Sequence, residues 1–403
     1  MQQNQLMVGH FTDINMLETM FVWCTPFIFF VHFLNVFFEN IRVGVIISIY
    51  IFLLFAIFCK KIKKHYLNIY IIIYILWSFL SVYAYLFNQL PTIIFFKQLS
   101  SSCLPIALYF LGRRFFYIKD RFYNMFLISC VFCFLFGLYW NYALPNYYLS
   151  YLSRIITWFN INYFLNHPRF NSFIGSTGVG VLFSISYLIS LEKIGKHNEL
   201  KYFLTMIISI IAVTFSMQRS AYLNFLFISL YFIVRNSNYR KKIISRLFLF
   251  FLLALPFYNF IGWDGIIDKI ISVPNAVSER AGQWANLHDI GLYIITGYGL
   301  GAMSHKALPY SDLLITDGAY LTIMGEQGII GILLLLVIIL LTYCKILRFK
   351  LLDECIIESL IILIFLISSF GSNTILFLSI SPFFWLSIGI IHEISFLKYK
   401  GKI

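Results

Sequence analysis

Charged residues are scarce in this sequence of 403 residues: Asp, Glu, Lys and Arg make up 12% of it, against 60% hydrophobic residues. A soluble domain has about a quarter charged residues, so this composition excludes an ordinary soluble protein. The alternation of polar and apolar residues that a membrane β-barrel requires is also missing. The mean hydropathy is +0.84, and apolar runs of about 15–22 residues recur from end to end, as in helices that cross a membrane.

The seven cysteines show neither a disulfide framework nor the spacing of a metal site. All of them fall in or near the apolar runs, and the pair Cys130-x-x-Cys133 lies inside one. We interpret them as packing residues and expect neither metal nor cofactor. No cleavable signal peptide, internal repeat or linker is recognisable, so we expect a single membrane domain over residues 1–403.

The pattern of apolar runs predicts an all-α polytopic membrane protein with about twelve transmembrane helices. The predicted spans lie near residues 20–38, 41–59, 66–87, 92–111, 122–142, 171–191, 203–217, 220–234, 247–261, 323–342, 356–371 and 375–392. If both termini are cytoplasmic, 22 of the 30 Lys and Arg fall in inside segments. The outside keeps Arg42, Lys97, Arg154, Arg169, Arg219, Lys269, Arg280 and Lys306. This asymmetry follows the positive-inside rule, so the net charge of +13 indicates topology rather than a nucleic-acid partner.

Two polar segments are then predicted on the outer face, a moderate loop at 143–170 and a large loop at 262–322. Their many aromatic residues suit elements at the lipid interface. In the large loop, 278–295 is predicted as a short helix, which the glycines of 297–301 end. The spacing of these glycines matches a phosphate cradle only weakly, because no strand precedes them.

Three outer arginines are candidates for binding an anionic group. Arg219 interrupts the apolar run 203–234 near its middle, so it is predicted at the outer tip of a tight helical hairpin. Arg169 precedes the sixth span and Arg280 lies in the large loop, and each is followed by ten residues and a glycine. A guanidinium can form two parallel hydrogen bonds to a phosphate. The alternatives are that these arginines contact lipid headgroups or pair with an acidic side chain.

Asp317 precedes the tenth span, where it is either the N-cap of that helix or a general base at the membrane surface. His305 and His288 are weaker acid–base candidates in the same loop. Glu326 lies so deep in the tenth span that it needs a partner there. Arginines gathered with an acid on the outer face predict a site for a lipid-linked pyrophosphate.

In order along the chain, these motifs resemble the O-antigen polymerase and ligase superfamily, most densely over 203–331. They are Arg169 with its glycine, Ser216-x-x-Arg-Ser-Ala221, Arg280-x-x-x-Trp284, Gly297-x-Gly-x-Gly301, Asp317-Gly-x-Tyr-Leu321 and Glu326-x-Gly-Ile-Ile-Gly331. The ligase branch has His in a His-Asn-x-x-Leu setting where this chain has Asp317. The resemblance therefore favours the Wzy-type polymerase.

The resemblance implies a metal-independent glycosyltransferase in the bacterial inner membrane that joins undecaprenyl-diphosphate-linked oligosaccharides on the periplasmic face. Arg219 and Arg280 would hold the pyrophosphate, and Asp317 would orient or deprotonate the acceptor hydroxyl. The further residues expected to bind the pyrophosphate or the sugars are Arg169, Trp284, His305 and Tyr320. Besides donor, acceptor and membrane lipids, a chain-length regulator is an expected partner.

Two other functions remain open at this point. The first is a ligase that transfers the glycan to a lipid A core. The second is a lipid-linked oligosaccharide flippase, which would instead need related halves and charges along a central cavity.

Overall fold

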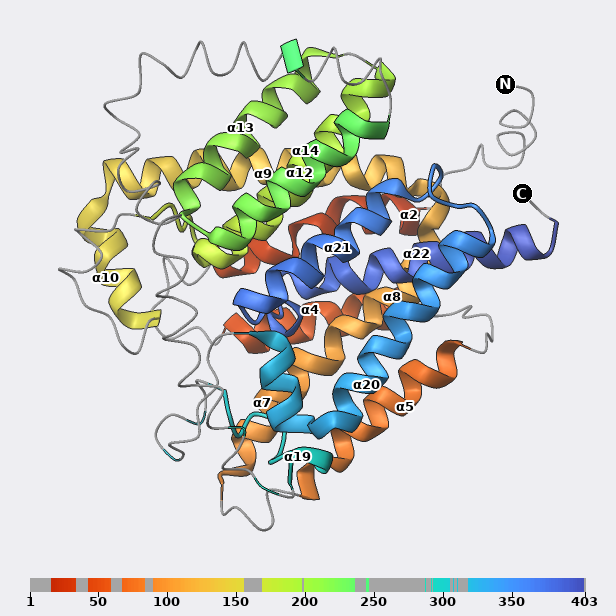
Figure 1. Cartoon of the computed structure of the whole chain (residues 1–403). Coiled ribbons are helices and arrows are strands. Elements are labelled where there is room, and N and C mark those ends of the chain that lie inside the picture. Colours follow the sequence, from red (N-terminus) through yellow and green to blue (C-terminus); the bar gives the residue numbers. More distant parts are fainter. Residues whose placement is uncertain are drawn as a thin grey trace.

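The computed structural model describes residues 16–33, 43–58, 67–83, 90–155, 169–197, 199–235, 244–245, 287, 291, 293–304, 307, 310 and 318–401. Every regular element of this part of the chain is helical (Figure 1), which confirms the all-α prediction. In chain order the elements are α2 (Met16–Cys24), η1 (Thr25–Phe33), α4 (Val43–Phe58), α5 (Leu67–Leu80), α7 (Thr92–Cys103), η2 (Leu104–Ile106), α8 (Ala107–Phe115), η3 (Phe116–Ile118), α9 (Lys119–Leu138), η4 (Tyr139–Ala143), α10 (Pro145–Ile155), α12 (Gly175–His197), α13 (Leu200–Ser216), α14 (Arg219–Arg235), α19 (Tyr293–Thr296), α20 (Ala319–Arg348), α21 (Ile356–Gly371), η7 (Thr374–Leu376) and α22 (Ser381–Tyr399).

Within the described residues, three helical stretches are long and apolar enough to cross a membrane by themselves: Thr92–Ala143, α12 and α20. Shorter apolar helices overlap other predicted spans, while the span predicted at 247–261 lies outside the described residues. The stretch Thr92–Ala143 turns back near η3, where Phe115 and Ile118 leave helical geometry, so it covers two predicted spans. The fold is thus all-helical and compatible with a membrane protein, and the number of crossings stays a prediction.

The peripheral helices turn apolar side chains outward. Leu80 on α5, Val234 on α14 and Leu340 on α20 are 62%, 76% and 62% exposed, and many other Ile, Leu and Phe residues share this orientation. In water such continuous apolar faces would promote association, whereas lipid tails solvate them. These outward apolar faces are compatible with a protein surrounded by lipid.

The centre of the bundle is formed by α12 and α22, whose side chains are buried over most of their length. Two glycines allow α8 and α22 to pack backbone to backbone. A Cβ on Gly112 would lie 2.3 Å from the carbonyl oxygen of Leu386, and one on Gly389 would lie 2.1 Å from that of Tyr109. Small residues at such crossings are typical of helices that pack without a hydrophobic driving force in lipid.

The hairpin predicted around Arg219 is present. Helix α13 ends at Ser216, Met217 adopts a left-handed conformation with φ of 53°, and α14 begins at Arg219. The hydroxyl of Tyr222 donates to the carbonyl oxygen of Thr214 at 2.8 Å and so ties the two helices at the turn. The polar interruption in the apolar run is therefore a tight helical connection.

Candidate functional site

The turn of the α13–α14 hairpin packs against the first turns of α12. The side-chain amide of Gln218 donates to the hydroxyl of Ser176 at 2.8 Å. A Cβ on Gly180 would lie 3.0 Å from that of Ala221, which shows how closely α12 approaches α14. Arg219 is the first residue of α14 and is half-buried at this turn.

Arg169 lies at the same end of the bundle, because the next residue, Phe170, is hydrogen-bonded to α13. The backbone N–H of Phe170 donates to the carbonyl oxygen of Phe215 at 2.8 Å, two residues before the hairpin turn. The half-buried Arg169 acts electrostatically on the hydroxyl of Tyr222. Tyr222 lies three residues after Arg219, on the same face of α14. The structure therefore brings two of the three predicted arginines to one end of the helices.

The backbone of Arg169 is held by two residues that the sequence did not single out. Its carbonyl oxygen accepts a hydrogen bond from the side-chain amide of Asn171 at 3.0 Å, and that amide also contacts the hydroxyl of Tyr148 on α10. The ring of Tyr148 packs at 5.8 Å from that of Trp140. No sequence signal distinguished Asn171 and Tyr148 from the many other polar and aromatic residues of this region.

Helix α20 begins at Ala319 with Gly318 at its N-cap position, while Asp317 lies outside the described residues, so both interpretations of Asp317 stay predictions. Tyr320 follows in the first turn of α20. Its hydroxyl donates to the carbonyl oxygen of Leu366 at 2.9 Å, and its ring packs edge-on against Phe370 at 4.9 Å. In this structure Tyr320 joins α20 to α21, and its predicted contact with a sugar stays a prediction.

The other predicted site residues lie outside the described part of the chain. They are Arg280, Trp284, His305 and Asp317. His288 lies outside it as well. Of the helix predicted at 278–295, the structure describes Leu287, Gly291 and the first three residues of α19. The roles of these residues therefore remain predictions.

The glycine-rich run is used for close packing against α20. The backbone N–H groups of Tyr298 and Gly299 donate to the carbonyl oxygens of Gly325 and Glu326 at 2.8 and 3.1 Å. Gly297, Gly299 and Gly301 all have positive φ, and a Cβ on Gly297 would lie 2.2 Å from the Glu326 carbonyl oxygen. Because these N–H groups are bonded to protein carbonyls, they do not form a phosphate cradle here.

Glu326 has the partner that its depth predicts. Its side chain is fully buried, and its carboxylate accepts a hydrogen bond from Gln98 on α7 at 3.3 Å. The described residues contain no group of three or more His, Cys, Asp or Glu side chains that could hold a metal ion. Cys130 and Cys133 are buried packing residues, as interpreted.

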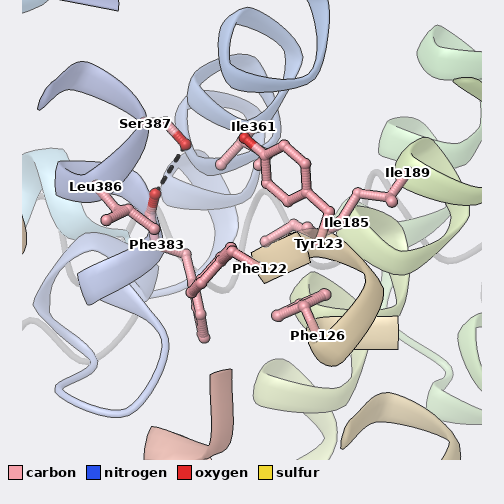
Figure 2. Close-up of a pocket in the computed structure, with 9 residues that line it drawn as sticks. All are labelled: Phe122, Tyr123, Phe126, Ile185, Ile189, Ile361, Phe383, Leu386 and Ser387. Carbon is pink, nitrogen blue, oxygen red and sulfur yellow. Dashed lines mark hydrogen bonds between the residues drawn. The ribbon is translucent and has the colours of Figure 1, made fainter. Parts of the chain in front are cut away.

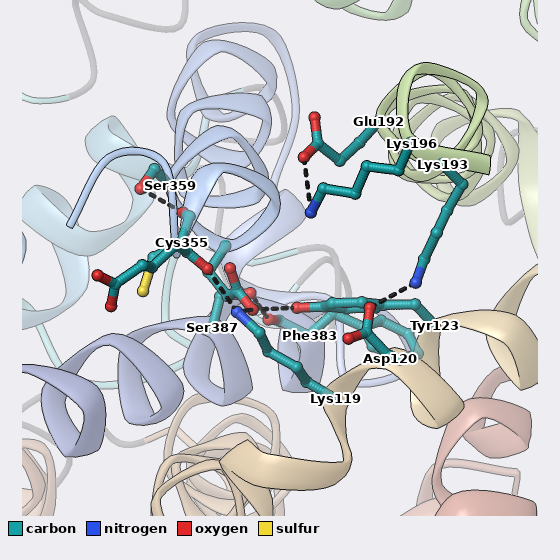
Figure 3. A network of polar contacts seen from close by, with 12 residues as sticks. Lys119, Asp120, Tyr123, Glu192, Lys193, Lys196, Cys355, Ser359, Phe383 and Ser387 are labelled. Carbon is teal, nitrogen blue, oxygen red and sulfur yellow. Dashed lines mark hydrogen bonds and ion pairs between the residues drawn. The ribbon is translucent and has the colours of Figure 1, made fainter. Parts of the chain in front are cut away.

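Of the basic residues predicted inside, Lys119, Lys193 and Lys196 lie close together (Figure 3), at the end of α12 that is far from the hairpin turn. Lys119 pairs with Glu358 at 3.0 Å, Lys193 contacts Asp120, and Lys196 pairs with Glu192 at 3.0 Å. Glu192 and Lys196 lie 16 and 20 residues after Ser176 on α12, so about 24–30 Å separates this network from the hairpin turn. The two groups of charges thus lie at the two ends of the helices, as a membrane topology requires, and these ion pairs serve to fix helix ends.

A small apolar cavity lies beside this network (Figure 2). Its lining residues are Phe122, Tyr123, Phe126, Ile185, Ile189, Ile361, Phe383, Leu386 and Ser387. Its volume of ≈ 10 Å³ is about the least that one water molecule needs. This cavity is a packing gap and holds no substrate.

Comparison with known protein families finds no family that matches this sequence, and comparison with curated proteins finds no match either.

Proposed function

We propose that this chain is a glycosyltransferase of the bacterial inner membrane that polymerises undecaprenyl-diphosphate-linked oligosaccharide units into a surface polysaccharide such as O-antigen. The observation that carries the proposal is the convergence of Arg169 and Arg219 at one end of an otherwise lipid-facing bundle. Guanidinium groups in this position suit a substrate whose pyrophosphate sits at the membrane surface and whose lipid tail stays in the bilayer. The outward apolar faces of the helices supply the lipid contact.

In the proposed reaction, a hydroxyl oxygen of the acceptor glycan attacks the anomeric carbon of the donor. The bond between that carbon and the pyrophosphate oxygen breaks, and undecaprenyl diphosphate leaves. Arg219 and Arg280 stabilise the negative charge on the leaving group, a contribution that grows where water is excluded. Asp317 accepts the proton of the attacking hydroxyl.

The test uses purified full-length protein in liposomes with lipid-linked repeat units, and polymer length is read on a gel. Arg219→Ala and Asp317→Asn are each expected to lower turnover by about 10²-fold or more, as for removal of one transition-state donor. Arg280→Lys is expected to impair the reaction as well, because a point charge does not reproduce two parallel hydrogen bonds. Arg235→Ala is the matched control, because Arg235 lies at the other end of α14, where it contacts Asp353.

Full-length polymer from both Arg219→Ala and Asp317→Asn would refute the assignment of the site. Cells that lack the gene separate the polymerase from the ligase. Loss of a polymerase leaves single repeat units attached to the lipid core, whereas loss of a ligase leaves none attached.

A further inference from the structure

Helix α20 is broken inside the bundle. Gly328 has φ of 72° and ψ of −176°, so Ala319–Gln327 and the residues after Gly328 form two separate helical parts. A break in the middle of an apolar helix leaves carbonyl groups without their intrahelical donors, and in lipid such groups must be satisfied by protein. The hydrogen-bond donors to these carbonyl groups therefore show which segments pack against the break.

Three carbonyls at the break receive hydrogen bonds from other segments. Two of these bonds come from the glycine-rich run, whose Tyr298 and Gly299 N–H groups bond to the carbonyl oxygens of Gly325 and Glu326. The third comes from the indole N–H of Trp77 on α5, which donates to the carbonyl oxygen of Gln327 at 2.8 Å. The break is thus paired with 297–299 on one side and with α5 on the other.

The approach of the two segments leaves no room for a side chain. A Cβ on Gly328 would lie 2.1 Å from the carbonyl oxygen of Ile295 and 2.7 Å from the backbone nitrogen of Gly297. Ordinary Cβ contacts are 3.4–4 Å, so the two backbones would have to separate by more than an ångström. Only glycine at position 328 permits both the backbone conformation and the contact.

Side chains extend the contact to α5 and α7. Leu300 and Ala302 pack in a buried cluster with Ile94 and Phe95 of α7, and Met303 packs near Met324 of α20. Buried polar groups lie beneath this cluster: Gln98 donates to Glu326 at 3.3 Å, and Ser78 donates to the side-chain oxygen of Gln327 at 3.4 Å. The glycine-rich run is therefore fixed directly to α20 and α7, and α20 is in turn held to α5 at the break.

The first part of α20 connects this contact to the proposed base. Ala319–Gln327 spans nine residues, or about 13 Å, and directly follows Asp317 and Gly318 in the chain. Its first turn is held to the connection between α21 and η7: the backbone N–H of Ala319 donates to the carbonyl oxygen of Ser372 at 3.3 Å, and the hydroxyl of Thr322 donates to the side-chain oxygen of Asn373 at 3.0 Å. Its inner end is held by the break. The segment that links the glycine-rich run to Asp317 is thus anchored at both of its ends.

We infer that the break at Gly325–Gly328 and the glycine-rich run form a joint that positions the outer segment carrying Asp317. Gly328 and Gly297 are then positioning residues for the proposed glycosyl transfer, which this inference takes as its premise. They act by permitting the close backbone contact. The joint allows an irregular loop to be anchored inside the bundle while its carbonyl and N–H groups stay satisfied.

Thiol labelling at position 302 tests whether the joint forms, independently of the rate of glycosyl transfer. Ala302 is fully buried, so a thiol introduced by Ala302→Cys should resist a membrane-impermeant maleimide in the full-length protein. The labelling of the parent protein, with its seven native cysteines, is the background to subtract. Adding Gly328→Ala should make the thiol at position 302 react at least tenfold faster.

Gly401→Ala is the matched control, because Gly401 also has a positive φ of 63° but has open space where the Cβ would go. Gly328→Ala alone should lower the rate of polymerisation at least tenfold while the donor KM changes less than threefold, because Arg169 and Arg219 lie on other segments of the bundle. A variant that is merely misfolded would lose binding and rate together.

Unchanged labelling in Gly328→Ala would overturn the joint itself. Increased labelling with a normal polymerisation rate would overturn its positioning role, provided that Arg219→Ala is inactive. Polymer from both Arg219→Ala and Asp317→Asn would refute the proposed function instead, and the labelling result would still decide whether the joint exists.

Discussion

A buried ion pair in the seam between α8 and α22 allows a quantitative test of the structure. The Arg113 guanidinium donates through Nε and Nη2 to the same Glu393 oxygen, at 3.0 and 2.8 Å, and both side chains are 5% exposed. The Lys345 side chain of α20 is also buried and lies close enough to interact electrostatically with both. Glu393 is therefore ion-paired with Arg113, and Lys345 is a second basic side chain near the pair.

This arrangement predicts that removing Glu393 and removing Arg113 destabilise the protein by different amounts. Removing one partner of a buried pair costs about 3–5 kcal/mol, because the other charge loses its compensation. Glu393→Ala should reach the upper part of this range, since it leaves the buried Arg113 guanidinium without its carboxylate and beside a second basic side chain, Lys345. Arg113→Ala should cost less, because Lys345 still accompanies the carboxylate.

The free energy of unfolding can be measured by titrating purified protein in mixed micelles with SDS. Lys398→Ala is the control, because the pair of Lys398 with Glu354 at 2.8 Å is partly exposed and should contribute about 1 kcal/mol or less. The reasoning fails if Glu393→Ala costs no more than Lys398→Ala, or if Arg113→Ala proves the more damaging of the two.

Two further predictions follow from the packing and the topology. Gly389→Ala should destabilise the protein by about 1–3 kcal/mol by forcing α22 from the Tyr109 carbonyl, whereas Gly44→Ala, with open space around it, should cost almost nothing. Equal unfolding curves for the two variants would contradict the contact between α8 and α22. Alkaline phosphatase fused after Tyr310 should be active and after Lys350 inactive, because only the first position is predicted outside. The reverse pattern would place the proposed site on the cytoplasmic face.

The α13–α14 turn is a feature that could be predicted from the local sequence. A helix in lipid needs an uninterrupted apolar run, so the polar residues before Arg219 indicated a connection, and the structure has one there. Glu326 was likewise expected to have a partner because a carboxylate is costly in an apolar bundle. That partner, Gln98, lies 228 positions away in the sequence, so no local pattern indicates it.

The break in α20 shows the opposite case. A single glycine in an apolar run is common in membrane helices, so Gly328 gave no reason to divide the span predicted at 323–342. Its conformation is required only because 295–299 packs against it. The glycine-rich run was similarly ambiguous until its N–H groups were found bonded to α20.

The sequence by itself determined the helical class, the position of the hairpin turn and the division of charges between the two ends of the helices. These depend on composition and on the local cost of placing polar groups in lipid, which each segment has on its own. Only the tertiary structure decided that Arg169 lies beside the hairpin, that α20 is broken, and that Arg113 pairs with Glu393 in a buried seam. These features come from pairs of distant segments, and their energies exist only once the helices have packed.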